Sequence, residues 1–382
     1  MIAGLRIAVL RETALGEARV AATPETVKKF IALGARVAIE TGAGVRAAIA
    51  DADYAAAGAE VASADQVLRG ADIVLGIQGP DPAVLAPVNP GAWIVAGLDP
   101  FGPTKEQGRA RIDAYAKAGF EALAMEFMPR ITRAQSMDIL SSQSNLSGYK
   151  AVIEAANAYG RAFPMMMTAA GTVSAAKCFV MGVGVAGLQA IATARRLGAQ
   201  VSATDVRSAT KEQIMSLGAK PVFVENVAGI EGEGAGGYAT EMSAEYQAAQ
   251  ADLVSSHIAK QDIVITTALI PGRAAPRLVS DAQLASMKPG SVVFDLAVAQ
   301  GGNVEGSKAD EVVIKHGVKI IGWSNTPAHL AADASALFSR NLYNFLSAFW
   351  DKDAGKPVLD DEIGNAVRLT QGGKVVSDRL QS

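Results

Sequence analysis

Cysteine is nearly absent from this sequence of 382 residues. The single cysteine, Cys178, has no partner for an internal disulfide and no second sulfur for a metal cluster. A lone cysteine fits a reducing compartment, where disulfides do not stabilise folds. These residue types therefore predict neither a disulfide framework nor a metal site.

Long apolar runs are missing as well. A membrane helix needs about 20 consecutive apolar residues, and the longest run of interest, FPMMMTAA at 163–170, is far shorter. The apolar stretch near the N-terminus is broken by Arg11 and is too short for the core of a signal peptide. The sequence thus predicts a soluble protein.

Neither charge sign is in large excess, and aromatic residues are few. The net charge is −3, so nucleic acid and anionic membrane surfaces are not indicated as partners. Hydrophobic residues make up 50% of the chain but aromatics only 5%, which favours α/β layers over an all-β sandwich. A chain this long exceeds one ordinary core and predicts two domains.

The first third of the chain alternates short apolar runs with helical segments. The segment 23–34 predicts a helix with Thr23 as N-cap, Pro24 at the first helical position and Gly34 at the end. Strands are predicted at 5–10, 35–40, 71–77, 92–98 and 120–125. This alternation is typical of a doubly wound parallel sheet.

A second unit of the same kind begins near residue 177. Its first strand leads into a helix that ends near Leu197, and further strands are predicted at 200–205, 221–224, 262–267, 291–296 and 318–323. A helix at 333–350 is expected to cross back onto the first unit, and a small hairpin is expected around Gly372 and Gly373.

The predicted fold class is therefore α/β, with two doubly wound parallel-sheet (Rossmann-like) domains joined by long helices. The first domain is expected to comprise residues 1–138 plus 332–382, and the second residues 139–331. Within the second, the glycine-dense segment 225–240 favours a mobile loop or lid over a plain linker.

A phosphate-binding fingerprint follows the first strand of the second unit. The residues 182-GVGVAG-187 supply Gly182, Gly184 and Gly187 between a strand and a helix, the context in which this pattern binds a dinucleotide pyrophosphate. Asp205 ends the next strand, where a carboxylate accepts hydrogen bonds from the ribose hydroxyls. NAD is favoured over NADP, although Arg207 is a residue type that accepts a 2′-phosphate. The alternative is a glycine-rich turn with a surface aspartate.

The stretch 129-PRITRAQSMDILSSQSN-145 is unusually rich in hydrogen-bonding side chains. It lies at the expected domain junction, where ligand clefts are common. Composition alone leaves two interpretations open: a ligand-binding loop, or a solvated helix start with Asp138 or Ser136 as N-cap.

Several long motifs resemble the NAD(H)-binding component of proton-translocating nicotinamide nucleotide transhydrogenase. They include MPRITRAQSMDILSSQSNLSGYKAV, FPMMMTAAGTV, GVGVAGLQAIATARRLGA, GAGGYATEM and MKPGSVVFDLAV. The resemblance runs from RETALGEARVAATPE to about Phe349, and alanine dehydrogenase is the wider relative of this family. The last thirty or so residues resemble it least.

The resemblance implies specific site residues. Arg130, Gln135 and Asp138 would hold the nicotinamide carboxamide and ribose and orient the ring for hydride transfer, with Ser141 beyond them. Tyr238, in the glycine-dense segment, would close over bound nucleotide. The remaining positions that match NAD contacts are Val185, Asp205, Val206, Arg207, Gly237, Gln250 and Leu269.

The resemblance also implies a reaction and partners. The chain would bind NAD(H), and hydride would pass directly to or from NADP(H) on a partner subunit, in a Re/Si-specific reaction coupled to proton translocation by a membrane-embedded subunit. A homodimer is expected from the family and from the apolar helix near the C-terminus, taken as exposed. The location would be cytoplasmic, peripheral to the inner face of the cytoplasmic membrane.

Two other functions compete with this one. An alanine or amino-acid dehydrogenase must move a proton and needs a placed lysine or histidine, but Gln78 and Gly97 stand where those enzymes have them. Arg19 is retained and is read either as a carboxylate ligand or as part of a structural salt bridge. A non-catalytic NAD-sensing module is the third interpretation. The three histidines lie outside the polar stretch, at His257, His316 and His329.

Overall fold

The computed structural model describes residues 4–102, 104–224, 244–269, 273–359 and 361–380. The chain divides into two compact units, Met1–Gln143 with Ala328–Ser382, and Ser144–Pro327. The division falls inside helix α5 (Ile139–Ala158). The sequence placed it at the beginning of this helix, because Asp138 precedes the first helical residue.

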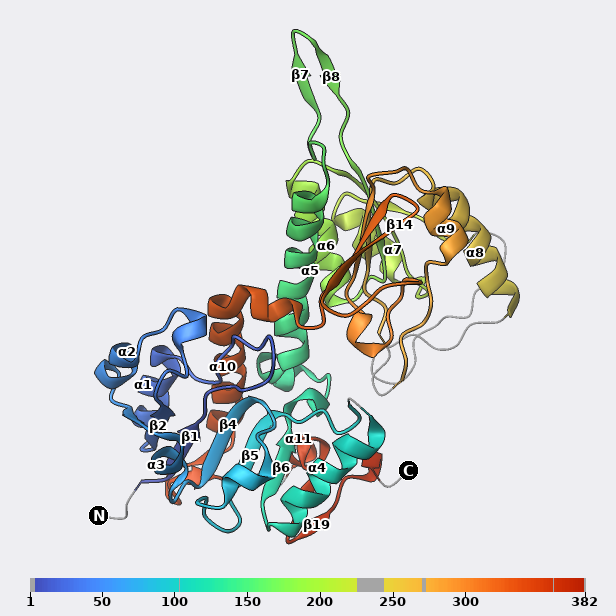
Figure 1. Ribbon diagram of the computed structural model, residues 1–382. Coiled ribbons are helices and arrows are strands. Elements are labelled where there is room, and N and C mark those ends of the chain that lie inside the picture. Colours follow the sequence, from blue (N-terminus) through green and yellow to red (C-terminus); the bar gives the residue numbers. More distant parts are fainter. Residues whose placement is uncertain (1–3, 103, 225–243, 270–272, 360, 381–382) are drawn as a thin grey trace. The chain divides into compact units, whose positions relative to one another are not determined.

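The first unit is built on a six-stranded parallel sheet (Figure 1). Its order is β3-β2-β1-β4-β5-β6, so the winding reverses between β1 and β4. All five predicted strands are present, and β3 was missed because its three residues are partly or fully exposed. The strands are β1 (Arg6–Val9), β2 (Arg36–Glu40), β3 (Glu60–Ala62), β4 (Ile73–Gln78), β5 (Trp93–Gly97) and β6 (Glu121–Ala124).

Helices cover both faces of this sheet. One face packs against α1 (Pro24–Ala32), α2 (Asp51–Ala56) and α10 (Ala331–Ala348), and the other against α3 (Ala64–Leu68) and α4 (Lys105–Lys117). As predicted, Thr23 caps α1, its side chain accepting the Thr26 N–H, and Pro24 is the first residue. Gly34 follows the helix end with φ +96°, a conformation that suits glycine.

Helix α10 has its apolar face buried in the first unit's core. Phe338, Leu342, Phe345 and Leu346 are each at most 2% exposed and pack with strand residues of that unit. The expectation that this helix exposes an apolar face for dimer formation was therefore wrong, because the helical spacing of its apolar residues faces its own sheet. After it come β16 (Trp350–Asp351), β17 (Lys356–Pro357) and α11 (Glu362–Val367). The predicted tail hairpin is present as β18 (Thr370–Gln371) and β19 (Lys374–Val375).

The second unit contains a seven-stranded sheet in the order β11-β10-β9-β12-β13-β15-β14. Only β14, at the edge, runs antiparallel to its neighbour. Four of the five predicted later strands are confirmed, but the segment 221–224 contributes only Lys220–Pro221, since proline has no N–H to continue a ladder. The strands are β9 (Lys177–Met181), β10 (Gln200–Thr204), β11 (Lys220–Pro221), β12 (Ile263–Thr266), β13 (Val292–Asp295), β14 (Glu311–Lys315) and β15 (Val318–Gly322).

Helices again flank this sheet on both sides. Helices α5, α6 (Val185–Arg196) and α7 (Thr210–Ser216) pack on one face. Helices α8 (Ala244–Ile258) and α9 (Asp281–Ser286) pack on the other. The two-layer cover on each sheet confirms the predicted α/β class.

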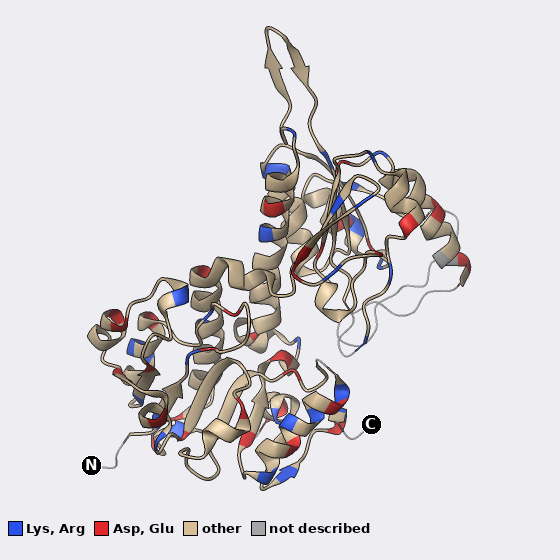
Figure 2. Cartoon of the chain, in the orientation of Figure 1, with Lys and Arg blue, Asp and Glu red and all other residues tan. Residues whose placement is uncertain are grey.

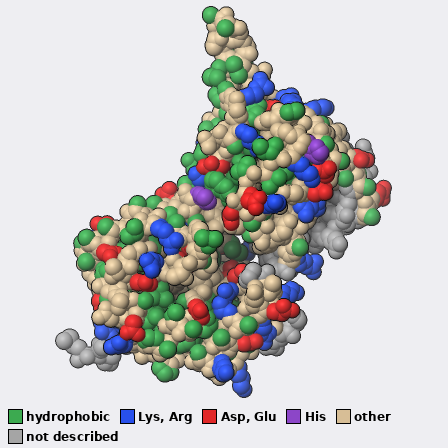
Figure 3. Space-filling model, viewed as in Figure 1, with side chains coloured by type: hydrophobic (Ala, Val, Ile, Leu, Met, Phe, Trp, Pro, Cys, Tyr) green, Lys and Arg blue, Asp and Glu red, His purple; other side chains and the backbone are tan. Residues whose placement is uncertain are grey.

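A two-stranded hairpin, β7 (Met166–Thr168) with β8 (Gly171–Val173), projects from the second unit (Figures 1 and 3). Its first strand and the preceding residue leave Met165, Met166 and Met167 exposed by 62%, 43% and 79%. The hairpin contains the apolar run judged too short to cross a membrane. Among the described residues, no helix combines the length and apolar character that crossing a membrane requires.

Candidate functional site

The glycine turn lies at the carboxyl end of β9. Gly182 has φ +98°, and its N–H donates to the Thr204 carbonyl of β10 at 2.9 Å. A Cβ on Gly182 would approach the Thr267 hydroxyl to 2.6 Å, and one on Gly187 would lie 1.9 Å from the Gly182 carbonyl. Any side chain at these two positions would push the turn, α6 and the loop after β12 apart.

Gly184 differs from its two neighbours. A Cβ at this position would meet nothing within 4 Å, so protein packing does not require glycine here. Gly184 is also the N-cap of α6, and no side chain caps that helix end. Open space above unpaired first-turn N–H groups is what a pyrophosphate needs. The cradle therefore fits a dinucleotide phosphate.

Asp205 follows β10 and is 8% exposed. Its carboxylate accepts the Val183 N–H of the glycine turn at 2.7 Å and the Arg207 guanidinium through Nε and Nη2, both at 2.9 Å. Burial alone would raise the pKa of Asp205, but the hydrogen bonds from Arg207 and Val183 outweigh burial and hold the pKa below its usual range. The acid is thus ionised and joined to the phosphate turn.

The polar stretch forms a short 3₁₀ helix, η4 (Thr132–Met137), in the first unit. Ala134 and Met137 are buried in the core of that unit, which leaves Gln135 exposed between them. Arg130, just before η4, is also exposed. The loop therefore has a fixed base and presents Arg130 and Gln135 outward.

Asp138 and Ser141 form the junction between η4 and α5. The Asp138 carboxylate accepts the Ser141 N–H at 3.0 Å and the Ser141 hydroxyl at 2.5 Å. Asp138 thus caps the helix, as the more conservative interpretation of this stretch expected. The cap also fixes both side chains relative to Gln135.

Two asparagines of α10 hold the polar loop and were not identified from the sequence. Asn341 Nδ2 and Asn344 Nδ2 both donate to the Ser136 carbonyl, at 2.8 and 3.0 Å. Asn341 Oδ1 also accepts the Ser142 hydroxyl at 2.7 Å. The available signal was two asparagines among the apolar positions of 333–350, a pattern that predicts a packed helix but no contact partner.

Arg19 resolves the alternative left open for it. Its guanidinium donates twice to the fully buried Glu17, at 2.8 and 2.7 Å, and once to Gln143 at 2.9 Å. Gln78 also donates to Glu17, at 3.4 Å. Arg19 therefore belongs to a buried structural network, and its donors are directed at protein groups.

The remaining predicted contacts are distributed over the second unit. Val185, the first residue of α6, is 37% exposed, and Leu269, after β12, is 39% exposed. Val206 and Gln250 are half-buried. Gly237 and Tyr238, with the rest of the predicted mobile loop, lie outside the described residues.

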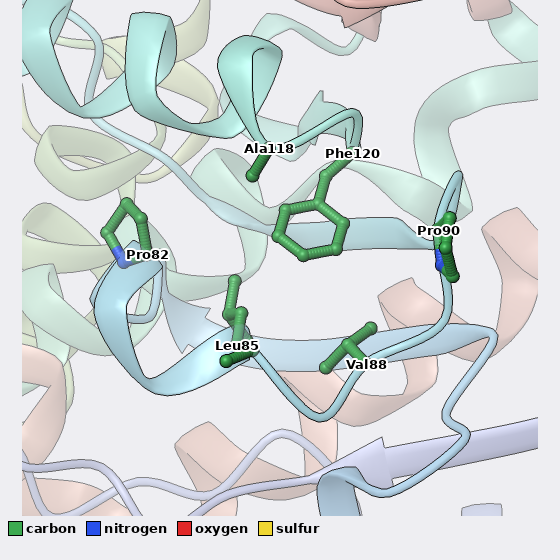
Figure 4. A pocket seen from close by; sticks show the side chains of 7 residues that line it. Pro82, Leu85, Val88, Pro90, Ala118 and Phe120 are labelled. Atoms are coloured by element: carbon green, nitrogen blue, oxygen red, sulfur yellow. The ribbon is translucent and has the colours of Figure 1, made fainter.

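The most hollow described surface in the first unit is not a nucleotide site. This cavity, of about 350 Å³, is lined only by apolar side chains (Figure 4): Pro82, Leu85, Ala86, Val88, Pro90, Ala118 and Phe120. None of these side chains could recognise a phosphate or a carboxamide. In the region of the chain that the structure describes, no three His, Cys, Asp or Glu side chains come together as metal ligands.

Comparison with known proteins agrees with this geometry. Residues 8–147 match the N-terminal domain and residues 151–378 the C-terminal domain of the alanine dehydrogenase/PNT family. The chain is 51% identical over 384 positions to the first of the split NAD(P) transhydrogenase alpha subunits of Rhodospirillum rubrum, covering 98% of this chain and 99% of that protein. It is 46% identical over 378 positions to the protein of the same name from Rickettsia prowazekii, covering 98% and 96%.

Among solved structures, a transhydrogenase from Sinorhizobium meliloti is 52% identical and superposes with a TM-score of 0.87, over 97% of this chain and 100% of that one. Sequence and fold thus agree over both units. The chain belongs to the alanine dehydrogenase/PNT family and, within it, to the alpha subunits of NAD(P) transhydrogenase.

Proposed function

We propose that this alpha subunit binds NAD(H) and carries out direct hydride transfer to or from NADP(H) held on a partner subunit, coupled to proton translocation by a membrane-embedded subunit. The observation that carries the proposal is the glycine turn of the second unit, open at Gly184 and joined to the ionised Asp205. Such a turn binds a pyrophosphate, and the acid accepts ribose hydroxyls.

The same two residues favour NAD over NADP. Arg207 is the cation nearest in sequence to the ribose-binding acid, but its guanidinium is engaged by Asp205 through two nitrogens. A carboxylate at this position repels a 2′-phosphate, and a paired guanidinium attracts one less strongly. The pair thus argues against NADP(H) as the ligand of this chain.

The polar loop of the first unit would orient the nicotinamide. The ring, when bound, supplies the hydride or accepts it at C4. Gln135 offers a donor and an acceptor from the rigid base of η4, and Arg130 offers a cationic donor. Asp138 and Ser141 hold the end of the loop through their mutual hydrogen bonds. Such fixed groups favour a near-attack geometry without a proton-transfer residue.

An amino-acid dehydrogenase is the competing function within the same family. It needs an acid–base residue beside the substrate, and this chain has Gln78 and Gly97 at the matching positions. In addition, Arg19 already donates to Glu17 and Gln143 rather than to an open space for a substrate carboxylate. These contacts favour transhydrogenation.

We also propose a homodimer at the inner face of the cytoplasmic membrane, held there through the partner subunits. The exposed methionines of the β7–β8 hairpin support self-association, because three large apolar side chains on a projecting two-stranded ribbon are costly to leave in water. A two-stranded ribbon is also only marginally stable without further packing.

The function is tested by offering the purified chain NADH and an NADP⁺ analogue with shifted absorbance, with and without a recombinant NADP(H)-binding partner. Rapid transfer only with the partner supports the proposal. The same preparation receives pyruvate and ammonium; turnover of these without the partner would contradict it and favour the dehydrogenase.

A further inference from the structure

Asn303 is a fully buried amide in the second unit, between β13 and β14. Its Oδ1 accepts the Ala268 N–H at 3.0 Å, while its Nδ2 donates to the Ala268 carbonyl at 2.9 Å and the Pro276 carbonyl at 2.8 Å. One side chain thus satisfies both backbone groups of Ala268, as a neighbouring strand would. It extends the order of β12 past Thr266, where the strand ends.

The backbone of Asn303 is equally fixed. Its N–H donates to the buried Asp295 carboxylate at 3.2 Å, and its carbonyl accepts the N–H groups of Leu278 and Val279 at 2.8 and 3.0 Å. Asp295 ends β13 and also accepts the Val304 N–H at 3.2 Å. The amide is therefore anchored to the sheet, so that Ala268 takes its position from Asn303.

Ala268 borders the glycine turn. The preceding residue, Thr267, donates its hydroxyl to the Gly182 carbonyl at 3.0 Å and its N–H to the Met181 carbonyl at 2.9 Å. A Cβ on Gly182 would lie 3.2 Å from the Ala268 nitrogen. Strands β9 and β12 are neighbours, and the winding of the sheet reverses between them. Ligands of such sheets bind beyond the strand ends at this reversal.

The sheet order also tells which half of a dinucleotide would lie over Ala268. Asp205 ends β10, on one side of β9, and binds the adenosine ribose in this type of site. With the pyrophosphate on the turn after β9, the other half extends over the end of β12, on the opposite side. Ala268 and the exposed Leu269 are found there.

We propose that Asn303 is a positioning residue for the nicotinamide half of the dinucleotide site, acting through Ala268. The inference rests on the proposed NAD(H) binding. Asn303 touches no ligand itself; it fixes the peptide against which the nicotinamide ribose and ring would rest.

The variant Asn303→Asp tests this role in the full-length chain. The carboxylate keeps the shape but replaces the Nδ2 donor by an oxygen that faces the carbonyls of Ala268 and Pro276. The Kd for NADH is expected to rise about tenfold, since the donated bonds are replaced by repulsion. The Kd for ADP, which carries only the adenosine half and the phosphates, should change by less than about twofold.

Matched variants separate this result from a general loss of stability. Asn89→Asp alters an amide in the first unit that donates to Gly70 and Asp72, and it should leave both dissociation constants unchanged. Asn303→Ser is the second variant should Asn303→Asp not fold. Equal weakening of NADH and ADP, no change in either, or failure of both Asn303 variants to fold would overturn the proposal. A wild-type chain that bound no NADH would instead overturn the proposed function.

Discussion

At the scale of single residues, the site is organised by carboxylates and amides that are already engaged with the protein. Asp205 holds both the Val183 N–H of the phosphate turn and the guanidinium of Arg207. Such prior engagement fixes the groups before a ligand arrives and lowers the entropy cost of binding. The carboxylate therefore sets both the geometry of the turn and the cofactor preference.

Replacing Asp205 should separate these two contributions. In Asp205→Asn, Arg207 loses its ionic partner and becomes available to a 2′-phosphate, while NADH loses an acceptor for its ribose. The Kd for NADH is expected to rise about tenfold and the Kd for NADPH to fall, as followed by fluorescence titration. Asp262→Asn, which removes a buried carboxylate paired with Lys288, is the matched control. An unchanged ratio of the two constants would refute this role.

Gln135 should affect transfer more than binding. The variant Gln135→Asn retracts the amide by one methylene from the rigid η4 base, so the ring loses its orientation but keeps the adenosine contacts. Hydride transfer in the presence of the partner is expected to slow about tenfold or more, with the Kd for NADH changed less than about twofold. Gln107→Asn, an exposed change on α4, is the control. A transfer rate equal to wild type would exclude the orienting role.

At the scale of elements, the β7–β8 hairpin is the piece of the fold least explained by the chain alone. It projects from the second unit and leaves methionines in solvent (Figure 3). By contrast, α10, which has a stronger apolar pattern, is fully used inside the first unit. Burial, rather than apolar content, distinguishes a core element from a contact surface.

Removing the exposed methionines should shift the assembly toward monomers. In the double variant Met166→Ser and Met167→Ser, loss of buried apolar area weakens the proposed dimer by about 1–2 kcal/mol per side chain. Light scattering over a dilution series would report a lower mass than for wild type. Met215→Ser, at an exposed methionine on α7, should leave the mass unchanged. A double variant with wild-type mass would place the interface elsewhere.

How much the sequence predicted differs between these scales. The glycine turn, its flanking elements and Asp205 were located from spacing alone, because their geometry is set by local chain conformation. The partners of Arg19, the asparagines that hold Ser136 and the clamp at Ala268 were not, because each joins residues far apart in the sequence. Strands β3 and β14 were missed since both are edge strands with exposed residues that lack an apolar signal.

At the scale of the whole molecule, charge balance and buried acids decide how the fold responds to pH. Charged side chains of both signs are interspersed over both units (Figure 2). In the first unit, however, the Glu126 carboxylate accepts the N–H groups of Leu98 and Asp99 at 3.1 and 2.5 Å, and burial raises the pKa of Glu126 to about 7. Burial likewise raises the pKa of Glu12 to about 7.

These raised pKa values predict a loss of stability with rising pH. The folded state binds more protons than the unfolded state between pH 4.5 and about 7, so the free energy of unfolding falls as pH rises through that window. The variant Glu126→Gln lacks one of the two groups and should lose on the order of 1–3 kcal/mol less than wild type. Denaturant unfolding across this range measures the difference, with the exposed Glu106→Gln as control. Parallel curves for Glu126→Gln and wild type would contradict it.

The central claim is that hydride passes directly between two nicotinamides without a protein acid or base. Single-turnover transfer from NADH deuterated at the transferred C4 position, with the partner present and in ordinary water, tests it most directly. Complete retention of deuterium in the NADPH product is the predicted result. Deuterium lost to water, or protium gained at C4, would mean that a protein group or solvent exchanges the transferred hydrogen, and the account of the polar loop would be wrong.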